Sequence, residues 1–302
     1  MQTSDPMEEV RSFLQGHGLS FSSPEKAISY LLSLLADDAS RDTLRALGRA
    51  GKERDKEDRR RAYLQAALAG GLQREELVYS FTLEVPGWES VPVHSRKNPY
   101  FRPEFFPQCG EDSSSPVVLV DGGGFIGDTL LEAGELFGER LSMVYVFEPD
   151  AANHALLTEM IRENRCEKKV RVYPEALSLL DGSAGLLSDG SHSRLSGDGK
   201  HVVRTVNAGR LFSSLFPSPT LIKLDIEGNE APVLLSMEEY LAEHTPDLAV
   251  CAYHRAEDIV LLPLLLHALQ PSYSLYLRHL SDTFLDTVLY AHNAACCAAH
   301  RA

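Results

Sequence analysis

The chain has 302 residues, of which 44% are hydrophobic and 24% charged, so it has the composition of an ordinary globular protein with room for a large and a smaller domain. Its net charge of −14 argues against a nucleic-acid partner, because neutralising phosphates requires a basic surface. No stretch approaches the roughly 18 consecutive apolar residues of a membrane span, and the acidic start resembles neither a signal peptide nor a transit peptide. We therefore expect a cytoplasmic protein with no nucleic-acid and no membrane partner.

Residues 1–85 are predicted to form a helical N-terminal extension, a small helical domain. Ser23 and Pro24 supply an N-cap and a proline at the first helical position, and apolar residues follow at helical spacing as far as Leu35. Two further helices are expected over residues 42–47 and 57–68, the second ending at the glycines 70 and 71. One hypothesis for this extension is that it forms a homodimer or binds a partner.

Residues 86–115 are predicted to be a polar linker with several prolines. The linker carries an aromatic group, namely Tyr100, Phe101, Phe105 and Phe106. Aromatic groups of this kind usually pack into a core. Because this group lies just before the next domain, a second interpretation stays open, in which it covers a ligand cleft.

Residues 116–302 are predicted to form an α/β domain, because short apolar runs alternate with amphipathic segments. Strands are expected over residues 117–120, 143–147, 170–173, 221–224, 248–252, 273–277 and 287–290, and helices over 128–137, 151–164, 231–241 and 258–269. The segment between the last two strands is too short for a helical crossover, so the last strand is expected to be antiparallel. Turns at residues 189–190 and 198–199 predict an inserted hairpin or small meander between residues 186 and 206.

Residues 117–127 have the pattern of a strand, a glycine turn and the start of a helix. Gly122, Gly124 and Gly127 satisfy the GxGxxG pattern, which lets the backbone turn sharply and approach a ligand closely. Glu148 lies at the end of the second expected strand, where a carboxylate can accept both ribose hydroxyls of an adenosine. The loop therefore predicts a cofactor that contains adenosine.

Two carboxylates, Asp121 and Asp128, flank these glycines and select between cofactors. A dinucleotide would place its anionic pyrophosphate here, whereas S-adenosylmethionine brings a cationic sulfonium and a protonated amine. Opposite charges a few ångströms apart in a partly desolvated cleft gain on the order of 1–4 kcal/mol, and like charges lose as much. The loop thus favours S-adenosylmethionine over NAD. For Asp128 an alternative stays open, that of an acid stabilised by the helix dipole in a first turn.

Three motifs in this chain resemble those of the FkbM family of methyltransferases. They are VDGGGFIGDT at residues 120–129, FEP at 147–149 and IKLDIEGNE at 222–230. The resemblance covers roughly residues 98–292 and leaves out the helical extension. It implies a doubly wound, Rossmann-like sheet of seven strands with the last antiparallel, and transfer of a methyl group, most often to a hydroxyl oxygen. Asn207 departs from the family, which often has an acidic residue there.

The cofactor-binding residues follow from the loop and from the resemblance. We expect Asp121 to bind the methionine amine, directly or through water, Glu148 to hold the ribose with Asn153 nearby, and the adenine to lie at the exit of the third strand. The expected set is Asp121, Gly122, Gly123, Gly124, Phe125, Ile126, Gly127, Asp128, Thr129, Glu148, Pro149, Asn153, Glu175, Ala176 and Asp225.

Four residues are predicted to be catalytic: Lys223, Asp225, Glu227 and His254. The first three alternate along the fourth predicted strand and so share one face, where they must pair with one another or line the cleft. We expect Asp225 to lie closest to the transferred methyl group. His254 ends the fifth predicted strand and suits a general base, because its ordinary pKa is near neutral; the alternative is a histidine that orients a loop or caps a helix.

The sequence predicts no metal site, because no zinc-type or hard-ligand motif with fixed spacing is present. A magnesium ion at Asp225 would need carboxylate partners that the sequence does not identify. The leading hypothesis is O-methylation of a small molecule, sugar or natural-product intermediate with S-adenosylmethionine as methyl donor. The alternatives are a nicotinamide-dependent oxidoreductase, which would change NADH absorbance, and a non-catalytic module, which would bind cofactor without turnover.

Overall fold

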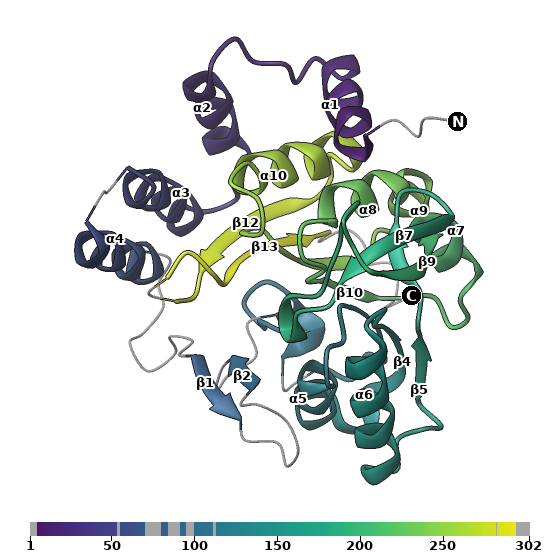
Figure 1. Ribbon diagram of the computed structural model, residues 1–302. Helices are drawn as coiled ribbons and strands as arrows, with labels where there is room; N and C mark the ends of the chain where they lie inside the picture. Colours follow the sequence, from purple (N-terminus) through teal and green to yellow (C-terminus); the bar gives the residue numbers. More distant parts are fainter. Residues whose placement is uncertain are drawn as a thin grey trace.

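The computed structural model describes residues 5–52, 55–69, 80–83, 91–94, 100–110, 113–281 and 283–293. Its main sheet is built, in chain order, from β3 (Val117–Gly122), β4 (Leu141–Phe147), β5 (Val170–Tyr173), β10 (Leu221–Leu224), β11 (Asp247–Cys251), β12 (Ser274–His279) and β13 (Thr287–His292). Within the described ranges these seven strands lie in the order β12-β13-β11-β10-β3-β4-β5 (Figure 1). β13 is antiparallel to both of its neighbours, and β3, β4, β5, β10 and β11 are mutually parallel. The predicted doubly wound sheet with an antiparallel last strand is confirmed.

Helices cover both faces of this sheet, and alternate residues of each strand point into two separate cores. The helices are α5 (Asp128–Phe137), α6 (Ala151–Glu163), α7 (Ala208–Ser214), α8 (Glu230–Ser236), α9 (Glu238–His244) and α10 (Asp258–Leu269). Val118 and Val120 pack with α7 to α10, whereas Val117 and Leu119 pack with α5, α6 and the segment 101–109. Burial on both faces explains why the strands are continuous apolar runs.

The N-terminal helices are α1 (Pro6–Gly16), α2 (Pro24–Leu34), α3 (Asp38–Ala50) and α4 (Lys56–Ala69). The cap predicted for α2 is present, since the Ser23 side chain accepts a hydrogen bond from the Lys26 N–H. α1 was not predicted, although Asp5 caps it in the same way ahead of a proline. The four helices follow one another around the β12 side of the sheet, and α10 lies between the sheet and α1 and α2 (Figure 1).

The segment between α2 and α3 closes the edge of the main sheet. Leu35 forms a parallel bridge with Leu275 of β12, and the Ala36 N–H donates to the Leu275 carbonyl at 2.8 Å. Farther along the same strand, the Leu277 N–H donates to Ser40 Oγ at 2.9 Å. An open strand edge can pair with another chain. The N-terminal segment satisfies these edge groups and so continues the sheet.

An ion pair reinforces this closure. Arg278, at the end of β12, places Nη2 2.6 Å from Asp37 Oδ2 and donates from Nη1 to Ser40 Oγ at 2.7 Å. Asp37 is also the N-cap of α3, since its side chain accepts the Ser40 N–H. Burial acts to raise the pKa of Asp37, but the hydrogen bonds from Arg278 and Ser40 outweigh it and lower the pKa to about 2.

Asp37→Ala is expected to lower the free energy of unfolding by about 2 kcal/mol, of which the lost cap accounts for about 1 kcal/mol and the partly exposed ion pair for the rest. A carboxylate with a lowered pKa stabilises the fold above its unfolded pKa, so this difference is present at pH 7 and disappears as the pH falls from about 4 to 2. Urea unfolding at several pH values measures it. The matched control is Asp38→Ala, because that side chain is 93% exposed and should contribute less than about 0.5 kcal/mol. Equal losses in both variants would contradict the role given to Asp37.

A second sheet is inserted after β5. Its strands are β6 (Ala176–Ser178), β7 (Gly182–Leu187), β8 (Arg194–Leu195) and β9 (His201–Asn207), in the order β6-β9-β7-β8. The short helix η4 (Gly190–His192) lies between β7 and β8. β7 and β8 form an antiparallel hairpin, whereas β9 returns to the other side of β7 and lies parallel to β6. The insertion therefore contains the predicted hairpin but is not a meander, and it begins earlier in the chain. Asn207 caps α7 by accepting the Arg210 N–H at 2.9 Å, and its Nδ2 donates to the Leu179 carbonyl at 2.7 Å, which a carboxylate could not do.

Three further features differ from or add to the predicted elements. The helix expected over residues 231–241 is divided at Met237 into α8 and α9, and Gly209 of α7 packs directly against the Ser236 backbone at this point. The hairpin β1 (Ser80–Leu83) and β2 (Val91–His94) is antiparallel, so residues 80–83, expected in the helical extension 1–85, form a strand instead. Residues 70 and 71, part of the linker 86–115, and Cys296 and Cys297 lie outside the described residues.

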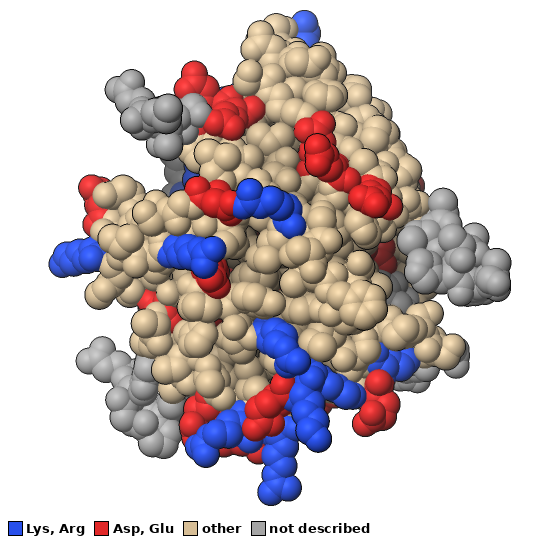
Figure 2. All heavy atoms as spheres, turned by 90° about the vertical axis from the view of Figure 1, so that its right-hand side faces the viewer, with Lys and Arg blue, Asp and Glu red and all other residues tan. Residues whose placement is uncertain are grey.

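The surface seen in Figure 2 carries charges of both signs. Lys and Arg gather toward the lower part of this face, where Asp and Glu are interleaved with them. Arg162 and Glu159 of α6 form a surface ion pair. Among the described residues, none of the helices combines the length and the apolar character that a membrane crossing requires.

Candidate functional site

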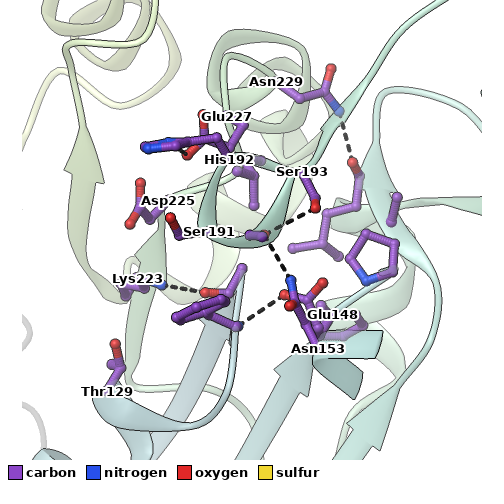
Figure 3. Close-up of a pocket in the computed structure, with 18 of the residues that line it drawn as sticks. Thr129, Glu148, Asn153, Ser191, His192, Ser193, Lys223, Asp225, Glu227 and Asn229 are labelled. Carbon is purple, nitrogen blue, oxygen red and sulfur yellow. Dashed lines mark hydrogen bonds and ion pairs between the residues drawn. The ribbon is translucent and has the colours of Figure 1, made fainter. Parts of the chain in front are cut away.

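One open cleft lies where the carboxyl ends of β3, β4 and β10 meet the inserted sheet, as expected for a ligand site in a parallel sheet (Figure 3). The polar lining side chains are Tyr100, Asp128, Thr129, Glu132, Glu148, Asn153, Ser191, His192, Ser193, Lys223, Asp225, Glu227, Asn229, Tyr253 and Asp286.

The glycine turn forms the floor of the cleft. The N–H groups of Gly123 and Gly124 both donate to the Phe147 carbonyl, at 3.0 and 3.1 Å, and so fix the turn to the end of β4. Gly123 has φ +82°, and a Cβ there would lie 1.9 Å from the carbonyl oxygen of Asp225. Only glycine allows β3 to approach the end of β10 this closely.

Glu148 is anchored beside that turn. Its Oε2 accepts the Phe125 N–H and its Oε1 accepts the Asp150 N–H, each at 2.9 Å. The side chain is 5% exposed and lines the cleft. Burial raises the pKa of Glu148 to about 7 although both hydrogen bonds favour the carboxylate. Each oxygen keeps lone pairs for a ligand hydroxyl.

Asp121 does not line the cleft, unlike the direct contact with an amine that the sequence analysis allowed. It is fully buried, and its Oδ1 lies 2.9 Å from Lys223 Nζ. The register explains the pair, because Asp121 of β3 lies directly beside Lys223 of β10. Burial acts to lower the pKa of Lys223, but the carboxylates of Asp121 and Asp225 outweigh it and raise the pKa well above its usual value. Asp121 is therefore the internal counter-ion of Lys223.

Asp225, Glu227 and His254 form a cluster at the opposite wall. His254 Nε2 lies 3.3 Å from Asp225 Oδ1 and 3.5 Å from Glu227 Oε1. The two carboxylates line the cleft, whereas the His254 side chain is 6% exposed and lies behind them. His254 is therefore not placed to contact an acceptor directly. Its Nδ1 lies 2.9 Å from Glu230 Oε1, in the first turn of α8.

These contacts shift the pKa values of the three side chains. Burial acts to raise the pKa of Asp225, but His254 and Lys223 outweigh it and hold the pKa well below its usual range. In Glu227, burial is likewise outweighed by His192 and His254, so its pKa is lowered. Burial acts to lower the pKa of His254, but Glu230, Asp225 and Glu227 raise it well above 6.5. The cluster is an ion-pair network whose carboxylates are charged at neutral pH.

Lys223, Asp225 and Glu227 all line the cleft, but not because they alternate along one strand as predicted. β10 ends at Leu224, and the Asp225 N–H donates to the Gly122 carbonyl at 3.0 Å. The backbone then turns with φ +56° at Glu227 and +92° at Gly228. This turn carries Glu227 back to the cleft beside Asp225.

Tyr253 and His192 line the cleft and were not predicted, whereas Tyr100 was considered only as part of the aromatic group. The hydroxyls of Tyr100 and Tyr253 donate to Asp225 Oδ2 at 3.0 Å and Oδ1 at 3.2 Å. His192, from η4 of the insertion, places Nδ1 3.3 Å from Glu227 Oε1 (Figure 3). The aromatic segment thus does both things considered for it, because Tyr100 lines the cleft whereas Phe105 and its neighbours fill the core.

The remaining predicted cofactor residues divide between the cleft wall and its support. The structure places in the wall Gly123, Phe125, Asp128, Thr129, Pro149, Asn153 and Ala176. Gly122, Gly124, Ile126, Gly127 and Glu175 do not line it. Gly124 packs against Val146, and Gly127 is the N-cap of α5 with φ +96°. Glu175 instead forms an ion pair with Arg204 at 3.3 Å.

Comparison with known families identifies the part of the chain that builds this cleft. The family described as Methyltransferase FkbM domain matches residues 122–271, which include the glycine turn, Glu148 and the Asp225 cluster. The chain carries an FkbM methyltransferase domain. The resemblance of the three motifs is confirmed by this match.

A solved structure shares the fold of the FkbM methyltransferase domain. A crystal structure of methyltransferase FkbM from Methylobacillus flagellatus KT is 22% identical and aligns over 88% of this chain with a TM-score of 0.59. This chain spans only 58% of the length of that protein. A putative rRNA methylase from Clostridium thermocellum aligns over 59% of this chain and 86% of its own, at 11% identity and a TM-score of 0.39. A similarity that low carries no argument about function. Comparison with curated proteins gave no match.

Proposed function

We propose that this FkbM methyltransferase domain transfers the methyl group of S-adenosylmethionine to a hydroxyl oxygen of a small molecule, such as a sugar or a natural-product intermediate. One observation carries the proposal: a single cleft joins an anchored carboxylate beside a glycine turn, Glu148, to the pair Asp225 and Glu227 on another wall. The first feature suits an adenosine, and the second suits an acceptor whose proton has to leave.

The cofactor would lie along the glycine turn. The ribose hydroxyls would donate to Glu148, and the adenine would lie against Ala176 and Leu177 where β6 begins. Asp128 lies in the cleft wall at the start of α5, and with Asp225 it would offset the positive charges of the amine and the sulfonium. Because Asp121 is internal, the electrostatic preference for this cofactor over a dinucleotide rests on Asp128, Asp225 and Glu227.

The transfer would be an in-line displacement. The acceptor oxygen forms a bond to the methyl carbon while the carbon–sulfur bond breaks, and its electron pair stays on the sulfur, which becomes a neutral thioether. The acceptor hydroxyl would donate a hydrogen bond to a carboxylate of the wall, Asp225 or Glu227, and its proton would leave to solvent. Much of the rate would come from alignment of the two reactants in the cleft. Tyr100 and Tyr253 position Asp225 through their hydrogen bonds.

Calorimetric titration with S-adenosylmethionine, S-adenosylhomocysteine and NADH tests the cofactor. We expect both adenosyl compounds to bind and NADH not to bind. We expect Glu148→Gln to weaken the binding of both adenosyl compounds by 10-fold or more. Transfer of a labelled methyl group to a panel of sugars, phenols and aliphatic alcohols then tests the acceptor class. Binding of NADH alone would overturn the proposal, and cofactor binding without transfer to any alcohol, amine or thiol would favour a non-catalytic module.

The affinity for S-adenosylhomocysteine is expected to depend on pH through Glu148. Ligand hydroxyls bind the carboxylate, and the pKa of Glu148 is about 7, so the dissociation constant should rise by about 10-fold between pH 8 and pH 6. Asp150, the charged neighbour of Glu148, has a lowered pKa and stays ionised over this range. Any pH effect of the ligand itself persists in Glu148→Gln, which is the control. An identical pH profile in both proteins would contradict the role of Glu148.

A further inference from the structure

Three ligand-type atoms converge on one point at the cleft wall. They are one carboxylate oxygen each of Asp225 and Glu227 and one ring nitrogen of His254, and all lie within 4.8 Å of one another. The two carboxylates come from the turn after β10, and the imidazole comes from the loop after β11. Oxygen and imidazole donors that approach from separate loops to one point are the arrangement of a metal centre.

The spacing fits ligands around an ion better than a set of hydrogen bonds. Nε2 lies 3.3 Å from Asp225 Oδ1 and 3.5 Å from Glu227 Oε1 in a side chain that is only 6% exposed, and, like Nδ1, it makes no hydrogen bond of acceptable geometry with any described residue. Two atoms that each lie about 2.1 Å from a cation are separated by about 3.0 Å at an octahedral angle and about 3.4 Å at a tetrahedral angle. A buried nitrogen aimed between two carboxylate oxygens thus has the spacing of a ligand.

The surroundings of His254 support the same assignment. Its other nitrogen, Nδ1, lies 2.9 Å from Oε1 of Glu230, whose side chain is 1% exposed and which is itself held by the Ile226 N–H at 2.9 Å. A histidine that binds a metal usually directs its second nitrogen to a carboxylate, because this fixes the ring and leaves the first nitrogen free for the ion. The second oxygen of Asp225, Oδ2, accepts a hydrogen bond from the Tyr100 hydroxyl at 3.0 Å, while the Tyr253 hydroxyl donates to Oδ1 itself at 3.2 Å.

We propose that Asp225, Glu227 and His254 bind one divalent cation, and that Glu230 positions His254 for it. The imidazole favours Mn²⁺ or Zn²⁺ over Mg²⁺ and Ca²⁺, which prefer ligand sets made of oxygen. Because both carboxylates line the cleft, the coordination positions not taken by protein ligands would face the cleft, where the acceptor is proposed to bind. An ion there lowers the pKa of a hydroxyl and aligns it. This inference rests on the proposed methyl transfer and replaces the sequence prediction of no metal.

Metal binding is tested without acceptor. The full chain, stripped with EDTA, is titrated with MnCl₂ while electron paramagnetic resonance reports free Mn²⁺, and ZnCl₂ is then added as competitor. We expect one site per chain that Zn²⁺ displaces. Glu227→Gln removes a ligand and should weaken binding more than 10-fold, and Glu230→Gln, through His254, by about 10- to 100-fold. The matched control is Glu132→Gln, which removes another acid of the same cleft and should change the affinity less than 2-fold.

The outcomes separate this inference from the proposed function. Absence of saturable Mn²⁺ and Zn²⁺ binding, or equal affinity in the native protein and in Glu227→Gln, would overturn the metal site. Circular dichroism of each variant establishes that it is folded, and a double variant Asp225→Asn/Glu227→Gln that still binds would also refute the site. Titration with S-adenosylhomocysteine is run in parallel. If S-adenosylhomocysteine binds and the metal ions do not, only the metal site is refuted. If the metal ions bind and S-adenosylhomocysteine does not, only the proposed cofactor is refuted.

Discussion

Lys223→Met is expected to lower the free energy of unfolding by about 3–5 kcal/mol, because it leaves the carboxylate of Asp121 buried without a counter-ion. Asp121 is 0% exposed, and apart from the ion pair with Lys223 neither of its oxygens has a hydrogen-bond partner among the described residues. Methionine keeps most of the length of lysine, so the loss reflects charge more than volume. Urea unfolding followed by circular dichroism measures it.

Two controls distinguish charge from packing. Asp121→Asn combined with Lys223→Met removes both charges and should recover at least half of the lost stability, because no buried charge remains. In the single variant Asp121 can relieve the strain by binding a proton, so the loss should be smaller at pH 5 than at pH 8. A single variant within about 1 kcal/mol of the native protein would show that the pair does not hold β3 against β10.

Asp225→Asn is expected to lower the rate of methyl transfer by about 10²- to 10³-fold, the range usual for the loss of one group that stabilises charge in the transition state. The affinity for S-adenosylhomocysteine should change less than 10-fold, because the proposed ribose site at Glu148 lies on another wall. The rate is measured as label transferred from S-adenosylmethionine to the best alcohol of the acceptor panel. The affinity is measured by calorimetry.

Tyr253→Phe is the graded comparison for this variant. It removes one hydrogen bond to Asp225 and keeps the charge, so it should lower the rate less than 10-fold. Should Asp225→Asn lose cofactor affinity as steeply as it loses rate, Asp225 would be a cofactor-binding residue only. A full rate in Asp225→Asn would remove it from the chemistry altogether.

The fold of the second half could be predicted because its signals are local. Continuous apolar runs such as residues 117–120 indicate buried strands. The short segment before β13 predicts that this strand is antiparallel to its neighbour. α1 carries equally local signals, an N-cap at Asp5 followed by Pro6, although the sequence analysis predicted no helix there. The division between α8 and α9 lies where Gly209 contacts the Ser236 backbone, and the local sequence does not reveal that contact.

The site divides in the same way. Glu148, Asp225 and Glu227 were identified from motifs, and the structure places them in one cleft, while their roles stay predictions. The inward turn of Asp121 could not be foreseen, because it requires knowing that β3 and β10 are neighbours in this register. Tyr100 is 125 residues from its partner Asp225, and no pattern in either segment announces that distant contact.

The bridge from Leu35 to β12 has a consequence for how the chain is made. Ser40 and Leu277, which form a hydrogen bond between the N-terminal segment and β12, are 237 residues apart. The first helices are therefore synthesised long before the strand that they cover. When β12 finally leaves the ribosome, its outer edge meets a partner that is already synthesised and tethered nearby. The nascent protein therefore exposes a strand edge to neighbouring chains only briefly.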